Sequence, residues 1–134
     1  MQSRIFPVWS IWRAFMALIQ FPSSAKTSKV LRWKDGRVQI VGAAWSDGTP
    51  LARVELKIDD RPWEKVTLDS RNRSKFCWTF WSCDWLKPEA GEHIIISRAT
   101  DVEGRTQPPA DDPMIQLKKT FWEANQQWPR RLRV

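Results

Sequence analysis

Short runs with a strict two-residue alternation constrain this chain more than any other feature. In LARVELKID (51–59) apolar side chains alternate with charged ones, and similar spacing recurs in RVQIVGAAW (37–45) and GEHIIISRATD (91–101). A period of two places one set of side chains on one face of an extended strand, whereas a helix needs a period of about 3.6. These runs therefore predict strands that each bury one face.

Turn-forming residues separate the runs at roughly ten-residue intervals. Gly, Pro, Asp and Ser cluster at 46–50, 59–62 and 88–91. Further strands are predicted at 63–68, 75–85 and 128–134. Short strands joined in this way are typical of an antiparallel β-sandwich. Residues 118–127 predict at most one helical turn, so a parallel α/β sheet is not expected.

The 134 residues carry a net charge of +7 that is unevenly distributed. Residues 1–37 hold seven basic and one acidic side chain, and residues 118–134 hold five and one. The body, residues 38–117, holds ten basic and thirteen acidic side chains. A nucleic-acid-binding domain concentrates basic residues on its folded body, so nucleic-acid binding is not expected. Basic ends indicate solvated tails or a surface that meets an acidic partner.

The apolar segment IFPVWSIWRAFMALIQF (5–21) is interrupted by one Pro, one Ser, one Arg and one Gln. A membrane span needs about 20 apolar residues, so no span is expected. A signal or membrane-surface segment and a leader outside the fold both remain open. The leader is favoured, because the charged region and cleavage site of a signal peptide are poorly formed. Residues 1–29 are therefore expected outside the fold, and one domain is expected at 30–134.

The chain offers little catalytic or metal-binding chemistry. Cys77 and Cys83 are six residues apart, which is about 20 Å along a strand and too far for a disulfide, so free thiols are expected. The single histidine, His93, is expected at the surface or at an edge. No CxxC spacing, convincing Ser/His/Asp set or glycine-rich phosphate loop is present. We expect no cofactor or metal to be bound by this chain itself.

Several motifs occur in a characteristic order. They are GAAW-S-DG (42–48), RVELKIDD-x-x-W (53–63), W-x-x-W (78–81), G-E-H-x-x-x-x-R-A-T-D-x-x-G-x-x-Q-P (91–108) and N-x-x-W (125–128). In this order they resemble the C-terminal dimerisation domain of molybdenum-cofactor oxidoreductases, which include sulfite oxidases, sulfite dehydrogenases and assimilatory nitrate reductases. The resemblance covers about residues 30–134. It implies an immunoglobulin-like sandwich.

The resemblance also implies where the chemistry lies. Family members carry molybdopterin-molybdenum in a separate, preceding catalytic domain, and neither Cys77 nor Cys83 corresponds to its metal-ligand cysteine. Some sulfite oxidases reach into the anion pocket with an arginine beyond the Q-P turn. Lys118 and Lys119 stand at the comparable place. Lysine lacks the bidentate fork of arginine, so an anion contact is an alternative to a solvated surface there.

Five residues of the RATD…QP segment are predicted to shape a turn: Arg98, Asp101, Gly104, Gln107 and Pro108. Arg98 and Asp101 have opposite charges near a strand end, so one of them is expected to fix the turn through main-chain hydrogen bonds. Contact with a neighbouring domain and a direct substrate role are the alternatives. Gly104 permits a left-handed backbone. Pro108 holds Gln107 extended and ends the strand pairing.

Residues 75–85, KFCWTFWSCDW, are aromatic on both faces of the predicted strand. Aromatic side chains are enriched in protein interfaces. The candidate interface residues are Trp81, Trp85, Trp122 and Trp128.

The leading hypothesis is a dimerisation and assembly module of a sulfite-oxidase-type enzyme, with two partners: a second copy of itself and a molybdopterin-binding catalytic domain. The chain would then be a fragment or one subunit of that oxidoreductase. A free-standing immunoglobulin-like binding module is the alternative.

Overall fold

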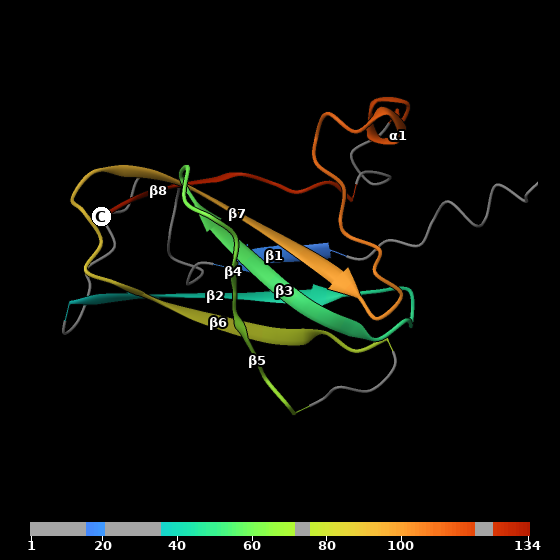
Figure 1. Ribbon diagram of the computed structural model, residues 1–134, viewed down its shortest axis with the longest axis horizontal. Helices are drawn as coiled ribbons and strands as arrows, with labels where there is room; N and C mark the ends of the chain where they lie inside the picture. Colours follow the sequence, from blue (N-terminus) through green and yellow to red (C-terminus); the bar gives the residue numbers. More distant parts are fainter. Residues whose placement is uncertain (1–15, 21–35, 72–75, 120–124) are drawn as a thin grey trace, which may run out of the picture.

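The computed structural model describes residues 16–20, 36–71, 76–119 and 125–134, with side chains from residue 36 onward. In these residues the strands form two four-stranded antiparallel sheets that pack face to face (Figure 1). The strand order is β1-β2-β6-β5 in the first sheet and β4-β3-β7-β8 in the second. The predicted all-β antiparallel fold is confirmed and is consistent with an immunoglobulin-like sandwich.

The first sheet consists of β1 (Met16–Gln20), β2 (Arg37–Trp45), β5 (Thr67–Leu68) and β6 (Thr79–Leu86). The second consists of β3 (Leu51–Ile58), β4 (Glu64–Lys65), β7 (Glu92–Asp101) and β8 (Arg130–Arg133). The connection from β7 to β8 contains the short helix α1 (Pro113–Gln116), capped by the Asp112 side chain.

The core lies between the sheets and is built from the inward-facing side chains of both. In β3 the alternation seen in the sequence is realised, because Val54 and Leu56 are buried while Arg53 and Glu55 face outward. Burial of one such aliphatic side chain stabilises the fold by about 1.5–3 kcal/mol. The core cluster comprises Val38, Ile40, Ala44, Leu51, Val54, Leu56, Trp81, Trp85, Ile95, Ala99 and Leu132.

Trp81 and Trp85 belong to this core, with only 2% and 4% of their surface exposed. Trp81 lies opposite Gly42 of β2 in the strand register, and the missing side chain of glycine leaves space for the indole. The expectation that Trp81 and Trp85 form an interface is therefore wrong. Alternation along β6 directs them inward and directs Phe80 outward. Trp122 lies outside the described residues.

Strand β1 corrects the expected position of the N-terminal segment. Met16–Gln20 pairs along β2, from Met16 opposite Trp45 to Gln20 opposite Val41. The prediction that residues 1–29 stand outside the fold is therefore wrong for these five residues. The reason is that the edge of β2 presents main-chain donors and acceptors that need a partner. The other residues of 1–29 are not described.

The strand predicted at 63–68 is divided between the two sheets. Lys65 of β4 pairs with Glu55 of β3, whereas Thr67 of β5 pairs with Ser82 of β6. The chain thus switches sheets at Val66, and in Figure 1 the β4–β5 segment runs across the direction of β2 and β6. Within the described part of the chain, no helix has the length and apolarity needed to cross a membrane.

Candidate functional site: the turn after β7 and an exposed aromatic face

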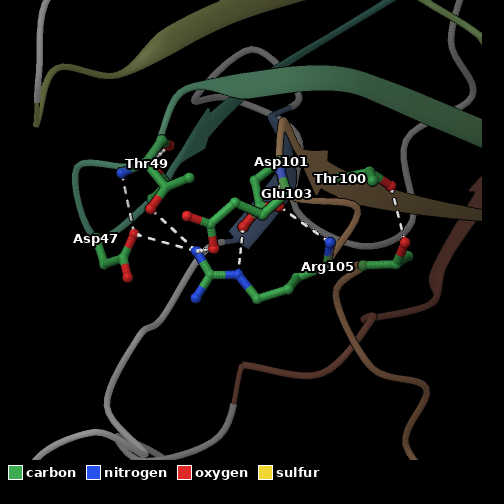
Figure 2. Close-up of polar contacts among 8 residues, drawn as sticks. Asp47, Thr49, Thr100, Asp101, Glu103 and Arg105 are labelled. Atoms are coloured by element: carbon green, nitrogen blue, oxygen red, sulfur yellow. Dashed lines mark hydrogen bonds and ion pairs between the residues drawn. The ribbon is translucent and has the colours of Figure 1, made fainter.

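Asp101 ends β7 and holds the turn that follows it. Its side chain is fully buried. The carboxylate accepts hydrogen bonds from the main-chain N–H groups of Glu103 at 2.9 Å and Arg105 at 3.0 Å (Figure 2). Gly104 donates its N–H to the carbonyl of Asp101 at 3.1 Å and has a φ of 83°, a conformation that glycine adopts without steric cost.

Arg105 connects this turn to the turn between β2 and β3. Its Nε lies 2.7 Å from Asp101 Oδ2, and its Nη2 donates to Thr49 Oγ1 at 3.0 Å. The same Nη2 lies 3.4 Å from Glu103 and 3.9 Å from Asp47 (Figure 2). The sequence analysis did not single out Arg105, although its four-residue spacing from Asp101 was a usable signal.

Arg98 lies away from the turn, so Asp101 is the member of the predicted pair that fixes it. Arg98 stands on the outer face of the second sheet, where its Nε donates to Glu55 Oε2 at 2.8 Å. Its guanidinium carbon is 4.1 Å from the ring centroid of Trp63. This is a cross-strand ion pair stacked on an aromatic ring.

Gln107 fastens the end of β7 to the segment that leads into β8. Its side chain is completely buried. Its Oε1 accepts from the Ala99 N–H at 3.3 Å, and its Nε2 donates to the Gln126 carbonyl at 2.9 Å. The carbonyl of Pro108 accepts from the Gln127 N–H at 2.8 Å. The conspicuous R-A-T-D…Q-P sequence is thus explained by a polar network that fixes one end of the sandwich.

The outer face of the first sheet carries exposed aromatic side chains. Trp78 is 50% exposed, Phe80 48% and Val41 37%. Trp45 at the end of β2 stacks on Trp78 with ring centroids 5.3 Å apart. We call Val41, Trp45, Trp78 and Phe80 the aromatic face.

A groove of about 530 Å³ borders the aromatic face and is lined by Val41, Phe80 and the loop after β5. At its rim Arg71 and Asp69 form an ion pair of 2.7 Å. Hydrogen bonds from Arg71 lower the pKa of Asp69 to about 2. An apolar centre with a polar rim is the usual anatomy of a protein–protein interface.

The comparisons with known proteins agree with this arrangement. Residues 10–125 match the Mo-co oxidoreductase dimerisation domain. The chain belongs to this family. The match begins before residue 30, where the sequence analysis placed the start of the domain. No match is found among curated proteins.

A solved structure similar to this dimerisation domain is the sulfane dehydrogenase SoxCD from Paracoccus pantotrophus. The TM-score is 0.70 at 20% sequence identity, and the similarity covers 91% of this chain and 32% of that one. At this identity the similarity establishes the fold. The dimerisation domain thus spans about a third of the length of the SoxCD chain.

The remaining predicted site residues are two lysines and one tryptophan. Lys118 is half-buried and donates from Nζ to Asn125 Oδ1 at 2.8 Å. Lys119 is exposed and Trp128 is half-buried. An anion contact of Lys118 or Lys119 and an interface role of Trp128 stay predictions.

His93 is buried rather than exposed, which corrects the expected position of this residue. Its Nδ1 lies 2.7 Å from Asp59 Oδ2 and its Nε2 lies 2.8 Å from the Glu89 carbonyl oxygen. Both oxygens only accept hydrogen bonds, so the doubly protonated imidazolium satisfies this arrangement. The hydrogen bond to Asp59 is the largest cause that raises the pKa of His93, and the same bond lowers the pKa of Asp59.

This pair makes the stability of the domain depend on pH. The contribution of His93 is complete below its ordinary pKa of 6.5 and is lost as the pH rises through its raised pKa. The contribution of Asp59 is present above 3.8 and is lost as the pH falls through its lowered pKa. We expect the Tm to fall as the pH rises from about 6 through the raised pKa of His93. In the His93→Gln variant the Tm should depend less on pH over this range. If its Tm changes as much as that of the original protein, titrating groups other than His93 cause the pH dependence.

The described residues also include two cysteines and a number of potential metal ligands. No group of three His, Cys, Asp or Glu side chains in them is placed to hold a metal ion. Cys77 is exposed and Cys83 is half-buried. Burial raises the pKa of Cys83, which keeps this thiol protonated and weakly nucleophilic.

Proposed function

We propose that this domain self-associates through its aromatic face and serves as the dimerisation and assembly module of a sulfite-oxidase-type molybdenum oxidoreductase. Molybdopterin-molybdenum would be bound by a catalytic domain or subunit outside the residues described above. That partner would carry out the redox chemistry, and this module would hold the partners in place.

The observation that carries the proposal is the exposure of Trp78 and Phe80 on the outer face of a sheet whose inner face already fills the core. Each large aromatic side chain can bury about 150–250 Å². Aromatic rings at the centre of an interface supply most of its binding energy. The membership of the chain in a family of dimerisation domains favours a second copy as the partner.

The charges around the aromatic face are compatible with a symmetric contact. Arg71 pairs with Asp69, and Arg37 lies 3.4 Å from Asp84 on the same side of the first sheet. Two copies related by a two-fold axis bring identical surfaces together. In both of these ion pairs the charge of the arginine is balanced by a neighbouring carboxylate. Two copies can therefore approach one another without bringing unbalanced like charges together.

Sedimentation velocity of the full chain over a range of concentrations tests the proposal. We expect a monomer–dimer equilibrium, and the double substitution Trp78→Ser with Phe80→Ser should raise the dimer Kd by about a hundredfold or more. The matched control is Met114→Ser with Leu117→Ser, because these side chains are 51% and 72% exposed but lie outside the aromatic face.

Two outcomes would contradict the proposal. One is a chain that stays monomeric at every concentration, which would favour a free-standing immunoglobulin-like binding module. The other is a dimer that both double variants weaken equally.

A further inference from the structure

The end of β6 has an open edge because the neighbouring chain leaves it. Strand β5 covers β6 only at Trp81 and Ser82. At Val66 the chain turns away and donates its N–H to the Val54 carbonyl of the other sheet at 3.1 Å. The position beside Asp84 and Leu86, where β5 would continue, is therefore not taken by a strand of the described residues.

The main-chain groups of Asp84 and Leu86 point into this open position. Asp69 donates its N–H to the Phe80 carbonyl at 2.8 Å, which shows that the groups of residue 80 face the β5 side. Lys87 donates its N–H to the Gly36 carbonyl at 2.7 Å, so the odd-numbered residue 87 faces the β2 side. Main-chain groups alternate along an antiparallel strand, and Asp84 and Leu86 thus present two donors and two acceptors.

A cavity of about 230 Å³ lies beside this edge, between the two sheets. Leu56, Ile58 and Trp85 form apolar walls, and Cys83 contributes its half-buried thiol. An engineered cavity of about 150 Å³ already holds benzene, so this one is large enough for a phenyl- or leucine-sized side chain. The indole N–H of Trp85 is buried without a hydrogen-bond acceptor among the described residues.

The charges at the cavity favour a basic neighbour of that side chain. Glu64 and Asp84 both line the cavity. Burial is the largest cause that raises the pKa of the Cys83 thiol, and the charges of these two carboxylates raise it further. Arg61 also lines the cavity, and its guanidinium carbon lies 6.0 Å from the ring centroid of Trp85.

We propose that the open edge of β6 binds an extended peptide segment of another protein as an added β-strand. One bulky apolar side chain of the segment fills the cavity. The adjacent side chain, a Lys or Arg that points to the outer face of the sheet, lies near the carboxylate of Asp84, whose side chain is 44% exposed. Only an extended peptide offers main-chain donors and acceptors at the spacing that Asp84 and Leu86 require.

The other long edge of the sandwich supports this assignment by contrast. Strand β8 exposes arginines along its edge, and charged side chains on an edge strand discourage the addition of a further strand. At the open end of β6 the residue in the comparable place is Leu86, which is 67% exposed. Of Asp84 and Leu86, only Asp84 is charged, so this edge carries fewer charged side chains than β8.

Selection of a phage-displayed library of random octapeptides on the full chain tests the proposal. We expect enrichment of peptides with a bulky apolar residue next to Lys or Arg. Leu86→Pro should weaken their binding by at least about tenfold, because it removes one edge N–H. The Leu86→Thr variant keeps that N–H and should bind the enriched peptides nearly as tightly as the original protein does. Cys83→Leu narrows the cavity but leaves the main chain of the edge unchanged, and it should also weaken peptide binding. This second variant still tests the proposal if the Leu86→Pro protein does not fold.

Failure to enrich any peptide overturns the proposal. So does equal binding to the original protein, Leu86→Pro and Cys83→Leu, which would place the peptides elsewhere, for example on the aromatic face. If Leu86→Pro instead shifts the monomer–dimer balance, a second copy occupies the edge and the assignment to another protein is wrong. None of these outcomes depends on the Trp78 and Phe80 variants that test self-association.

Discussion

Replacement of Asp101 by Ala is expected to lower the free energy of unfolding by about 3 kcal/mol. The substitution removes the acceptor of two main-chain N–H groups and the closest partner of Arg105. The side chain of Arg105 is only 32% exposed, so part of its charge is left without compensation. The nearby carboxylates of Glu103 and Asp47 recover some of that loss, which places the expected cost at the lower end for a broken buried ion pair.

Urea denaturation followed by tryptophan fluorescence measures this cost. Asp101→Asn keeps an acceptor oxygen but loses the charge. Its free energy of unfolding is expected to lie between those of Asp101→Ala and the original protein. Glu103→Ala is the matched control, since the Glu103 side chain is 59% exposed and should change stability by less than about 1 kcal/mol. If Asp101→Ala costs no more than Glu103→Ala, Asp101 does not hold the turn.

Adjacent residues of β6 are expected to respond in opposite ways to truncation. Trp81→Ala should cost about 3 kcal/mol of unfolding free energy, because it opens a cavity in the core. The indole N–H of Trp81 has no hydrogen-bond partner among the described residues. Because the substitution removes this unsatisfied buried group, the loss of unfolding free energy should lie in the lower part of the usual range for Trp→Ala. Phe80→Ala should cost less than about 1 kcal/mol, since Phe80 is 48% exposed.

Both variants should be unfolded in urea at low protein concentration, where a dimer contributes little to the apparent stability. A larger loss for Phe80→Ala than for Trp81→Ala would mean that β6 presents its other face to the core. In that case the aromatic face as defined by Val41, Trp45, Trp78 and Phe80 would not exist.

The sequence was most informative where only one face of a strand is apolar. Arg53, Glu55 and Lys57 alternate with aliphatic residues in β3, so both the strand and its buried face could be predicted. In β6 aromatic residues occupy both faces, and sequence alone offers no reason to prefer Trp81 over Phe80 for the core. The register with β2, which sets Gly42 opposite Trp81, decides it.

Contacts between residues far apart in the sequence explain the other differences between the predicted and the observed structure. The partner of His93 is Asp59, which is 34 positions away and belongs to a turn of another strand connection. Met16–Gln20 forms a strand only because β2 offers it an edge, and its apolar residues show no alternation that would predict this. The turn after β7 was predictable because Asp101 binds main-chain N–H groups only two and four positions away. The contact of Gln107 with Gln126, 19 positions away, was not predictable from the sequence.

In an assembly module, the turn network would hold the sandwich together and the aromatic face would form the contact with the partner. Asp101, Arg105 and Gln107 join segments at one end of the sandwich through partly buried hydrogen bonds. A stiff support reduces the entropy lost when a surface is fixed in a contact. The aromatic face lies on strands rather than on a loop, apart from Trp78 just before β6.

The most direct test of the central claim is photo-cross-linking of the full chain from single positions on each outer face. A benzophenone side chain introduced at Ser82 lies beside Phe80 and Val41 on the outer face of the first sheet, and one at Lys57 lies on the outer face of the second. We expect irradiation to yield a covalent dimer from position 82 and essentially none from position 57. Dimers formed from position 57 alone, or from neither position, would contradict self-association through the aromatic face.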